Sequence, residues 1–216
     1  MMDMIYSMDI LLSFVLLSVL FSFSTSRLVV MIRIVVLQGV VVSVAPFFLE
    51  DSMTAGTLVF TLSILTIRGI VIPWSIYAVV QKMGIKRALE INVGYHASLF
   101  FCLLLIVGAQ MLSLKFNMMD FRGSTLMVST AITLIMGGLF LLMARRNAIV
   151  MVLAYMMMEN GISLLGAPLS AGAHTIVEFG ILLDVLAGVM IMGIMLQSIQ
   201  QKYVNLDTAQ LRKLKE

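Results

Sequence analysis

The chain has 216 residues, of which 61% are hydrophobic and 12% charged, and its formal net charge is +3 at pH 7. Soluble domains carry roughly twice that share of charge, so the composition excludes a soluble globular domain and indicates an integral membrane protein. A single cysteine, Cys102, excludes an internal disulfide and a zinc cluster. The N-terminal stretch MMDMIYSMDILL has acids and no basic region, which favours a permanent membrane helix over a cleavable signal.

Apolar runs long enough to cross a bilayer, which takes about 20 residues as a helix, recur along the whole chain. In chain order they are Met4–Ser24, Leu28–Leu49, Met53–Val80, Val93–Leu114, Gly123–Ala144, Asn147–Ala167 and His174–Ser198. The short linkers predict antiparallel neighbours. The sequence therefore predicts an all-α integral membrane protein with seven transmembrane helices in a single membrane domain. Four helices occupy residues 1–122, a three-helix unit occupies 123–198, and a polar tail occupies 199–216.

Basic residues collect on one side of this topology. With the C-terminus in the cytoplasm and the N-terminus outside, ten basic residues fall in inside segments and two, Lys115 and Arg122, fall outside. The ten are Arg27, Lys82, Lys86, Arg87, Arg145, Arg146, Lys202, Arg212, Lys213 and Lys215. Because cytoplasmic loops of membrane proteins are enriched in Lys and Arg, this orientation is the predicted one.

Two acids lie deep within the last two predicted spans. Glu159 is eight residues from the outer end of its span and Asp184 ten, which places them about 12 and about 15 Å deep. Ionisable groups at such depth are costly and mark ion paths or partners. Both are candidate proton or ion relay residues, since burial favours the neutral form of a carboxyl group. The alternative is a protonated acid that hydrogen-bonds a neighbouring helix.

Arg68 lies near the middle of the third predicted span and is too deep to reach water easily. It needs a counter-charge, which Glu159, Asp184 or an acid of a partner chain would supply. An arginine beside a carboxylate favours the ionised form and opposes the effect of burial, so Arg68 is predicted to tune the relay. A purely structural buried pair is the alternative. Arg33, close to a predicted span end, is expected to extend its side chain to the surface.

Further residues qualify this picture. Glu178 and His174 share a helix face at the outer end of the last span; they are a possible accessory site, with a water-exposed surface pair as the plainer interpretation. Pro73 is expected to kink the third span, five residues after Arg68. Gly161, two residues after Glu159, permits either local unwinding or close helix approach.

Redox and hydrolytic motifs are absent from the sequence. The two histidines, His96 and His174, fall at opposite membrane faces and cannot share a haem. The last span has no lysine for a retinal Schiff base, and no iron–sulfur cysteine cluster, phosphate loop or nucleophile motif occurs. We expect no catalytic residue, metal or cofactor in this chain.

The C-terminal half of the chain resembles a known family. The segments RRNAIVMVLAYMMMENGISLL, IVEFGILLDVLAGVMIMGIMLQSI and VNLDTAQLRKLKE resemble the hydrogenase-4 component E family, membrane subunits of formate hydrogenlyase-type nickel–iron hydrogenase complexes. The last three spans are also similar to the K subunit of respiratory complex I and the C subunit of multisubunit sodium/proton antiporters. The segment TIRGIVIPW, with Arg68 and Pro73, fits the same family, and the likeness is looser over the first four spans.

This resemblance implies a role for the two deep acids. In the K subunit each of the last two helices carries a buried glutamate thought to serve proton translocation; Glu159 corresponds to the first and Asp184 to the second, with aspartate in place of glutamate. It implies a non-catalytic subunit in the cell inner (cytoplasmic) membrane. Its partners would be antiporter-like subunits, a complex I-like membrane base subunit and, indirectly, nickel–iron and iron–sulfur chains of a cytoplasmic arm. A sodium/proton antiporter subunit and a purely structural spacer are the alternatives.

Overall fold

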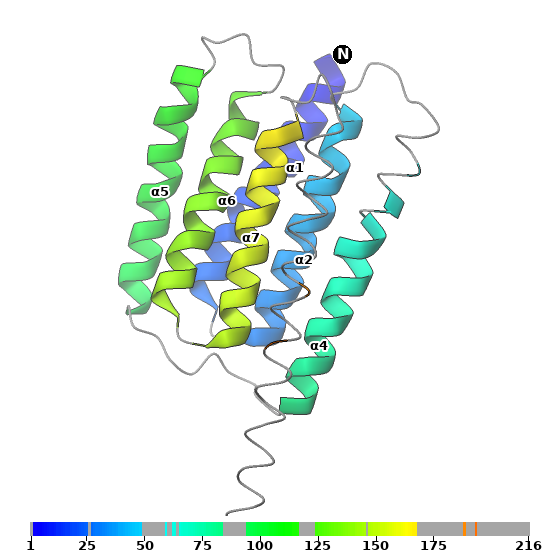
Figure 1. Cartoon of the computed structure of the whole chain (residues 1–216). Coiled ribbons are helices and arrows are strands. Elements are labelled where there is room, and N and C mark those ends of the chain that lie inside the picture. Colours follow the sequence, from blue (N-terminus) through cyan, green and yellow to red (C-terminus); the bar gives the residue numbers. More distant parts are fainter. Residues whose placement is uncertain are drawn as a thin grey trace, which may run out of the picture.

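The computed structural model describes residues 2–25, 27–48, 65–83, 94–116, 124–145 and 147–167, together with positions 59, 62, 63, 188 and 193. Within these residues the regular structure is helical, with six α-helices (Figure 1). They are α1 (Met2–Ser24), α2 (Leu28–Val44), α4 (Ile72–Met83), α5 (Tyr95–Phe116), α6 (Thr125–Ala144) and α7 (Ala148–Gly166). A 3₁₀ turn, η1 (Ala45–Phe48), follows α2, and a π-helix, η2 (Ile67–Val71), leads directly into α4.

Four helices of the described part are long and apolar enough to cross a membrane. The spans are Tyr6–Ser24, His96–Lys115, Thr125–Ala144 and Ile149–Gly166, within α1, α5, α6 and α7. The protein is therefore a multi-pass membrane protein. These four agree with the predicted spans to within a few residues at each end.

The predicted count of seven spans is confirmed only in part, because the described residues hold six α-helices and four of full membrane length. The second predicted run, Leu28–Leu49, yields an α-helix that ends at Val44, where Pro46 removes a backbone donor and the chain tightens into η1. In the third, Met53–Val80, the π-helix and α4 form a shorter apolar element. Of the seventh, His174–Ser198, the structure describes positions 188 and 193 alone, and the tail over 199–216 lies outside the described residues.

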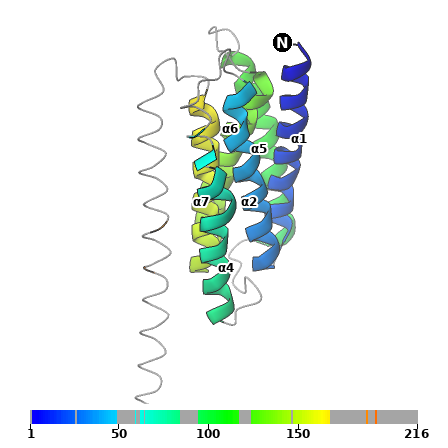
Figure 2. The ribbon, with the colours of Figure 1, turned by 90° about the vertical axis from the view of Figure 1, so that its right-hand side faces the viewer.

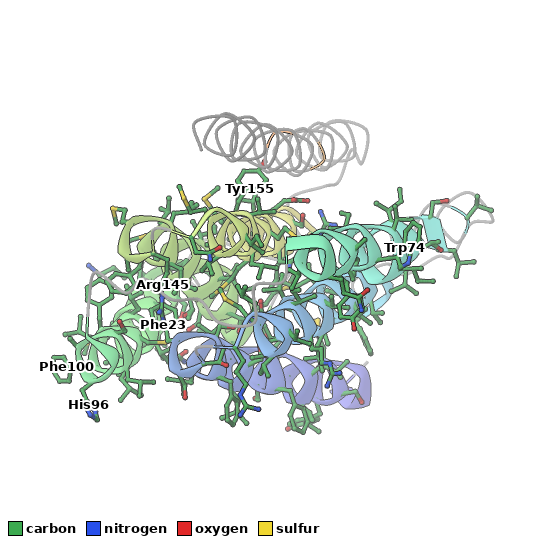
Figure 3. The ribbon with its side chains drawn as sticks, turned by 90° about the horizontal axis from the view of Figure 1, so that it is seen from below. Phe23, Trp74, His96, Phe100, Arg145 and Tyr155 are labelled. Atoms are coloured by element: carbon green, nitrogen blue, oxygen red, sulfur yellow. The ribbon has the colours of Figure 1, made fainter. Side chains whose placement is uncertain are left out.

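The helices form a bundle in which successive elements run antiparallel (Figures 1 and 2). The α1–α2 pair packs on the α6–α7 pair, and α6 and α7 share the largest interface. Helix α5 packs against α1 and α6, whereas α4 and η2 pack against α2 (Figure 3). Helix α2 therefore stands between α1 on one side and α7 and η2 on the other.

Glycines allow α6 and α7 to approach closely. A Cβ on Gly138 would lie 2.7 Å from the Ala154 carbonyl oxygen, and one on Gly161 would lie 2.7 Å from the Ala131 carbonyl oxygen. Both would meet backbone, which cannot move aside as a side chain can, so this packing requires glycine at each position. Helix α7 continues through Gly161 to Gly166. Of the two possibilities open for Gly161, the structure has close approach and not unwinding.

An aromatic stack joins three helices near one end of the bundle. Phe140 of α6 stacks on Phe23 of α1 at a centroid distance of 5.4 Å and on Phe101 of α5 at 4.3 Å. Large apolar side chains elsewhere face outward, among them Trp74 on α4 and Phe100 on α5, which are 73% and 69% exposed (Figure 3). Such exposure along helix flanks is expected where lipid, and not water, is the surrounding medium.

Arg27 and Arg145 lie at one end of the bundle, where α1 turns into α2 and α6 into α7 (Figure 1). Burial lowers the pKa of the Arg145 guanidinium from its ordinary value by desolvation. Arginine nevertheless keeps its charge near neutral pH.

Candidate functional site: a buried ion pair between α7 and the π-helix

Arg68 and Glu159 form an ion pair in the interior of the bundle. The Nη2 of Arg68 donates to the Oε1 of Glu159 at 2.6 Å, and the two side chains are 7% and 3% exposed. The residues are 91 positions apart in the chain. Of the counter-charges that the sequence left open for Arg68, the structure brings Glu159 into contact. Charge-assisted hydrogen bonds of this length are the strong ones in proteins.

The π-helix explains how Arg68 reaches the interior. In an α-helix Pro73 would deny the Gly69 carbonyl its hydrogen bond, and the proline ring would clash with that carbonyl. The wider turn of η2, over Ile67–Val71, includes Gly69 and precedes the proline. A kink was expected at Pro73, and the helix carries a π turn directly before this residue, a feature that occurs frequently at functional sites. Arg68 is the buried residue of this turn.

The α7 side of the site is built from three polar residues in two neighbouring turns. Ser163 lies four residues after Glu159, on the same helix face, and its hydroxyl accepts a second hydrogen bond from Arg68 Nη2 at 3.0 Å. Asn160 is buried beside Glu159 and donates from Nδ2 to the Val35 carbonyl oxygen of α2 at 3.5 Å, the long limit for such a contact. The ion pair is thus held within a polar group and not isolated among apolar side chains.

Gly39 of α2 makes room for this polar group. A Cβ at this position would lie 3.5 Å from Asn160 Oδ1 and 3.8 Å from Arg68 Cβ. These are ordinary van der Waals distances, so an alanine would fit at this position. A side chain larger than alanine would press on both elements of the site.

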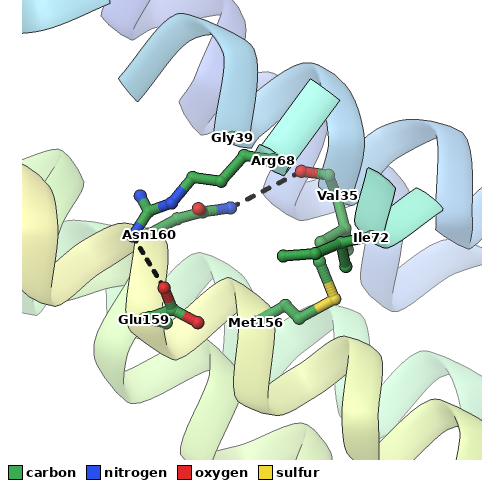
Figure 4. Close-up of a pocket in the computed structure, with 7 residues that line it drawn as sticks. All are labelled: Val35, Gly39, Arg68, Ile72, Met156, Glu159 and Asn160. Atoms are coloured by element: carbon green, nitrogen blue, oxygen red, sulfur yellow. Dashed lines mark hydrogen bonds and ion pairs between the residues drawn. The ribbon is translucent and has the colours of Figure 1, made fainter. Parts of the chain in front are cut away.

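A small cavity opens between these groups (Figure 4). Its volume of about 10 Å³ is close to the minimum that holds one water molecule. The residues that line it come from α2, η2, α4 and α7, and they are Val35, Gly39, Arg68, Ile72, Met156, Glu159 and Asn160. A carboxylate, a guanidinium and an amide therefore face a space of the size that one water molecule requires.

The chemistry of this arrangement follows from its two charges. Arginine is always charged in proteins, whereas a carboxylic acid can take up a proton. With Glu159 ionised, the pair is neutral overall and each partner offsets the burial cost of the other. With Glu159 protonated, Arg68 keeps its charge but no longer has the negative charge of Glu159 beside it. The site can hold and release one proton, and each change alters the balance of charge around Arg68.

The other predicted site residues, Asp184, Glu178 and His174, lie outside the described residues. Sequence reasoning missed Ser163 and Asn160. Their signal was present, since Ser163 follows Glu159 at helical spacing and Asn160 is its neighbour. The sequence did not single out Gly39 and Val35, because they lie among many similar apolar and small residues of the same helix. In the part of the chain that the structure describes, no group of three or more His, Cys, Asp or Glu could hold a metal ion.

Comparison with known proteins finds one informative similarity. The chain is 25% identical over 188 residues to the uncharacterized protein Rv0085 of Mycobacterium tuberculosis (strain ATCC 25618 / H37Rv), and the match covers 86% of this chain and 85% of that protein. No protein-family model matches the chain. No solved structure matches it.

Proposed function

We propose that this chain is a cofactor-free membrane subunit of a complex I-related, formate hydrogenlyase-type hydrogenase complex, in which it contributes to proton or ion translocation. The observation that carries the proposal is the buried Arg68–Glu159 pair beside a cavity near the size of a water molecule. A charged pair at this depth is costly, and such groups in membrane proteins usually mark ion paths. The resemblance of the Glu159 region to the hydrogenase-4 component E family adds the hydrogenase context.

In this proposal Glu159 is a relay residue and Arg68 tunes it. A proton that reaches Glu159 removes the counter-charge of Arg68, so proton uptake is opposed by the arginine and release is favoured by it. Asp184, on the next predicted span, is the proposed second relay residue. The catalytic nickel–iron site and the iron–sulfur clusters would belong to other chains, and this chain would have no catalytic residue.

The proposed setting is the cell inner (cytoplasmic) membrane, with seven spans, the N-terminus outside and the C-terminus in the cytoplasm. The chain would pack between antiporter-like large subunits and a complex I-like base subunit, and it would touch lipid but no nucleic acid. The exposed apolar flanks of α1, α4 and α5 support extensive contact with lipid or membrane partners. The buried pair would lie near the middle of such an assembly.

The relay role is tested by Glu159→Gln, which keeps the shape of the side chain but removes its charge and its proton exchange. Ion movement is measured with a pH-sensitive dye in lipid vesicles that contain the purified native assembly. We expect loss of ion movement while the assembly stays intact and its electron transfer continues. Ser163→Ala is the matched control, because it removes a contact of Arg68 and changes no charge. Undiminished ion movement in Glu159→Gln would remove the relay role.

The hydrogenase context is tested separately by purification through a C-terminal tag in mild detergent, followed by mass spectrometry and nickel analysis. Nickel together with antiporter-like and iron–sulfur chains would support the proposal. Antiporter-like chains without nickel would favour the sodium/proton antiporter alternative. The structural-spacer alternative predicts that Glu159→Gln causes the complex to dissociate instead of slowing ion movement. A buried ion pair between helices that are distant in sequence also stabilises the packing of those helices.

A further inference from the structure

A second buried polar site joins α1 to α2. The Gln38 side chain is fully buried, and its Nε2 donates to the Ser18 hydroxyl at 2.9 Å. Ser18 is 8% exposed and donates in turn to the Val15 carbonyl oxygen at 2.6 Å. No sequence pattern singled out either residue, because serine and glutamine are uncharged and tolerated in membrane helices.

The hydrogen bonds of Ser18 agree with the orientation of the Gln38 amide. Ser18 donates its single hydroxyl proton to the Val15 carbonyl oxygen and accepts from Gln38 Nε2. The amide nitrogen thus faces Ser18 and the amide oxygen faces away. That oxygen, Oε1, is buried, and no hydrogen-bond donor in the described part of the chain reaches it. A buried amide oxygen without a donor is penalised, and an internal water is the usual remedy.

The Gln38 site lies level with the Arg68–Glu159 pair. Gln38 is ten residues after the start of α2 and Glu159 eleven after the start of α7, or about 15 and 16 Å from the same end of the bundle. Gly39, the next residue after Gln38, lines the cavity of the ion-pair site together with Asn160. Val35 lines the cavity of that site and neighbours Gln38 one turn along α2. One stretch of α2 therefore borders both polar sites.

We propose that Gln38 Oε1 binds one internal water molecule, and that this water extends the polar region of the Arg68–Glu159 pair toward α1. Gln38 then acts as a positioning residue, because it holds this water on the side of the bundle that α1 and α2 form. Ion movement on that side would depend on the water. The role in ion movement rests on the proposed function above, whereas the water site does not. A purely adhesive role for Gln38 would need only the bond from Nε2 to Ser18, and it leaves the buried Oε1 unexplained.

The water site is tested on the full chain in lipid by infrared spectroscopy in ordinary and isotopically labelled water. The variant Gln38→Met preserves side-chain length and removes both polar atoms. We expect an O–H stretching band that shifts with the label in the parent protein and in the control Ser22→Ala, and that is absent in Gln38→Met. If Gln38→Met does not fold, Gln38→Asn replaces it, and its shorter amide must shift the band. A band that is identical in every variant overturns the water site.

The positioning role is tested in vesicles that contain the native assembly. We expect Gln38→Met to slow ion movement about tenfold, the effect of losing one buried hydrogen bond on a barrier, and Gln38→Asn to restore part of the rate. Ser22→Ala, which removes a buried hydroxyl of α1 that donates to the Ser18 carbonyl oxygen, is the control and should change the rate far less. An unchanged rate in Gln38→Met, with a reduced rate in Glu159→Gln, overturns the role of Gln38 and leaves the proposed function intact. Unchanged rates in both variants overturn both.

Discussion

Removing either charge of the buried pair should have unequal consequences for stability. In Glu159→Gln the amide oxygen can still accept from Arg68, but the guanidinium cannot lose its proton and no longer has the carboxylate charge of Glu159 beside it. Loss of one partner of a buried pair costs about 3–5 kcal/mol. In Arg68→Met the remaining carboxylate can become neutral by taking up a proton. It then leaves a buried polar group with fewer partners, which costs about 1–3 kcal/mol.

The double variant Arg68→Met/Glu159→Gln removes both charges of the described pair. Its cost should be close to that of Arg68→Met alone and well below the sum of the two single variants. The expected coupling is about 3 kcal/mol, at the upper end of the range for residues in contact. The 2.6 Å separation and the exposures of 7% and 3% support so large a value, because solvent screens this pair little.

The free energy of unfolding of each variant is measured for the full chain in mixed micelles, by denaturant titration followed with far-ultraviolet circular dichroism. The reasoning is refuted if the two single costs add in the double variant, since the charges would then not interact. It is refuted equally if Arg68→Met destabilises more than Glu159→Gln, because proton uptake by the carboxylate would then give no relief. Ser163→Ala, which removes one neutral hydrogen bond to Arg68, should cost only about 0.5–1.5 kcal/mol.

Three further predictions concern the packing of the bundle, and each is checked by the same titration. Gly161→Ala should destabilise by about 1–3 kcal/mol through overpacking against backbone, whereas Gly108→Ala on α5, where a Cβ meets open space, should be neutral or stabilising by up to about 1 kcal/mol. Ser124→Ala removes the hydroxyl that accepts from the third backbone N–H of α6 and should cost about 0.5–2 kcal/mol. Phe140→Leu removes the two stacking contacts of the Phe140 ring, at a cost of about 0.5–1.5 kcal/mol each. The variant Phe100→Leu, at an exposed position, should change stability little. Equal losses of stability in the two variants would contradict the packing described for α5 and α6.

Much of the helical architecture was predictable from the sequence because the bilayer imposes a length and a composition on every span. The helices α1, α5, α6 and α7 begin and end within a few residues of the predicted runs. The prediction was poorer around Pro46 and Pro73. The backbone can accommodate a proline inside an apolar run through a 3₁₀ turn, a kink or a π turn. The hydropathy of the sequence does not distinguish these three outcomes.

The deep charges were visible in the sequence because apolar helices make them conspicuous, so Arg68 and Glu159 were candidates by depth alone. Which acid would meet Arg68 was decided by the fold, through the π turn that points Arg68 inward and the glycines that bring α6 against α7. The sequence did not indicate a role for Gln38 or Ser18. An uncharged polar residue costs little free energy to insert into a membrane, and its importance depends on the groups that face it in the fold. The order of apolar runs thus determines which segments cross the membrane. Which polar side chains meet in the interior is determined only by the packing of helices that are distant in sequence. The depth of a residue in the membrane follows from its own helix, whereas a contact depends on how two helices pack.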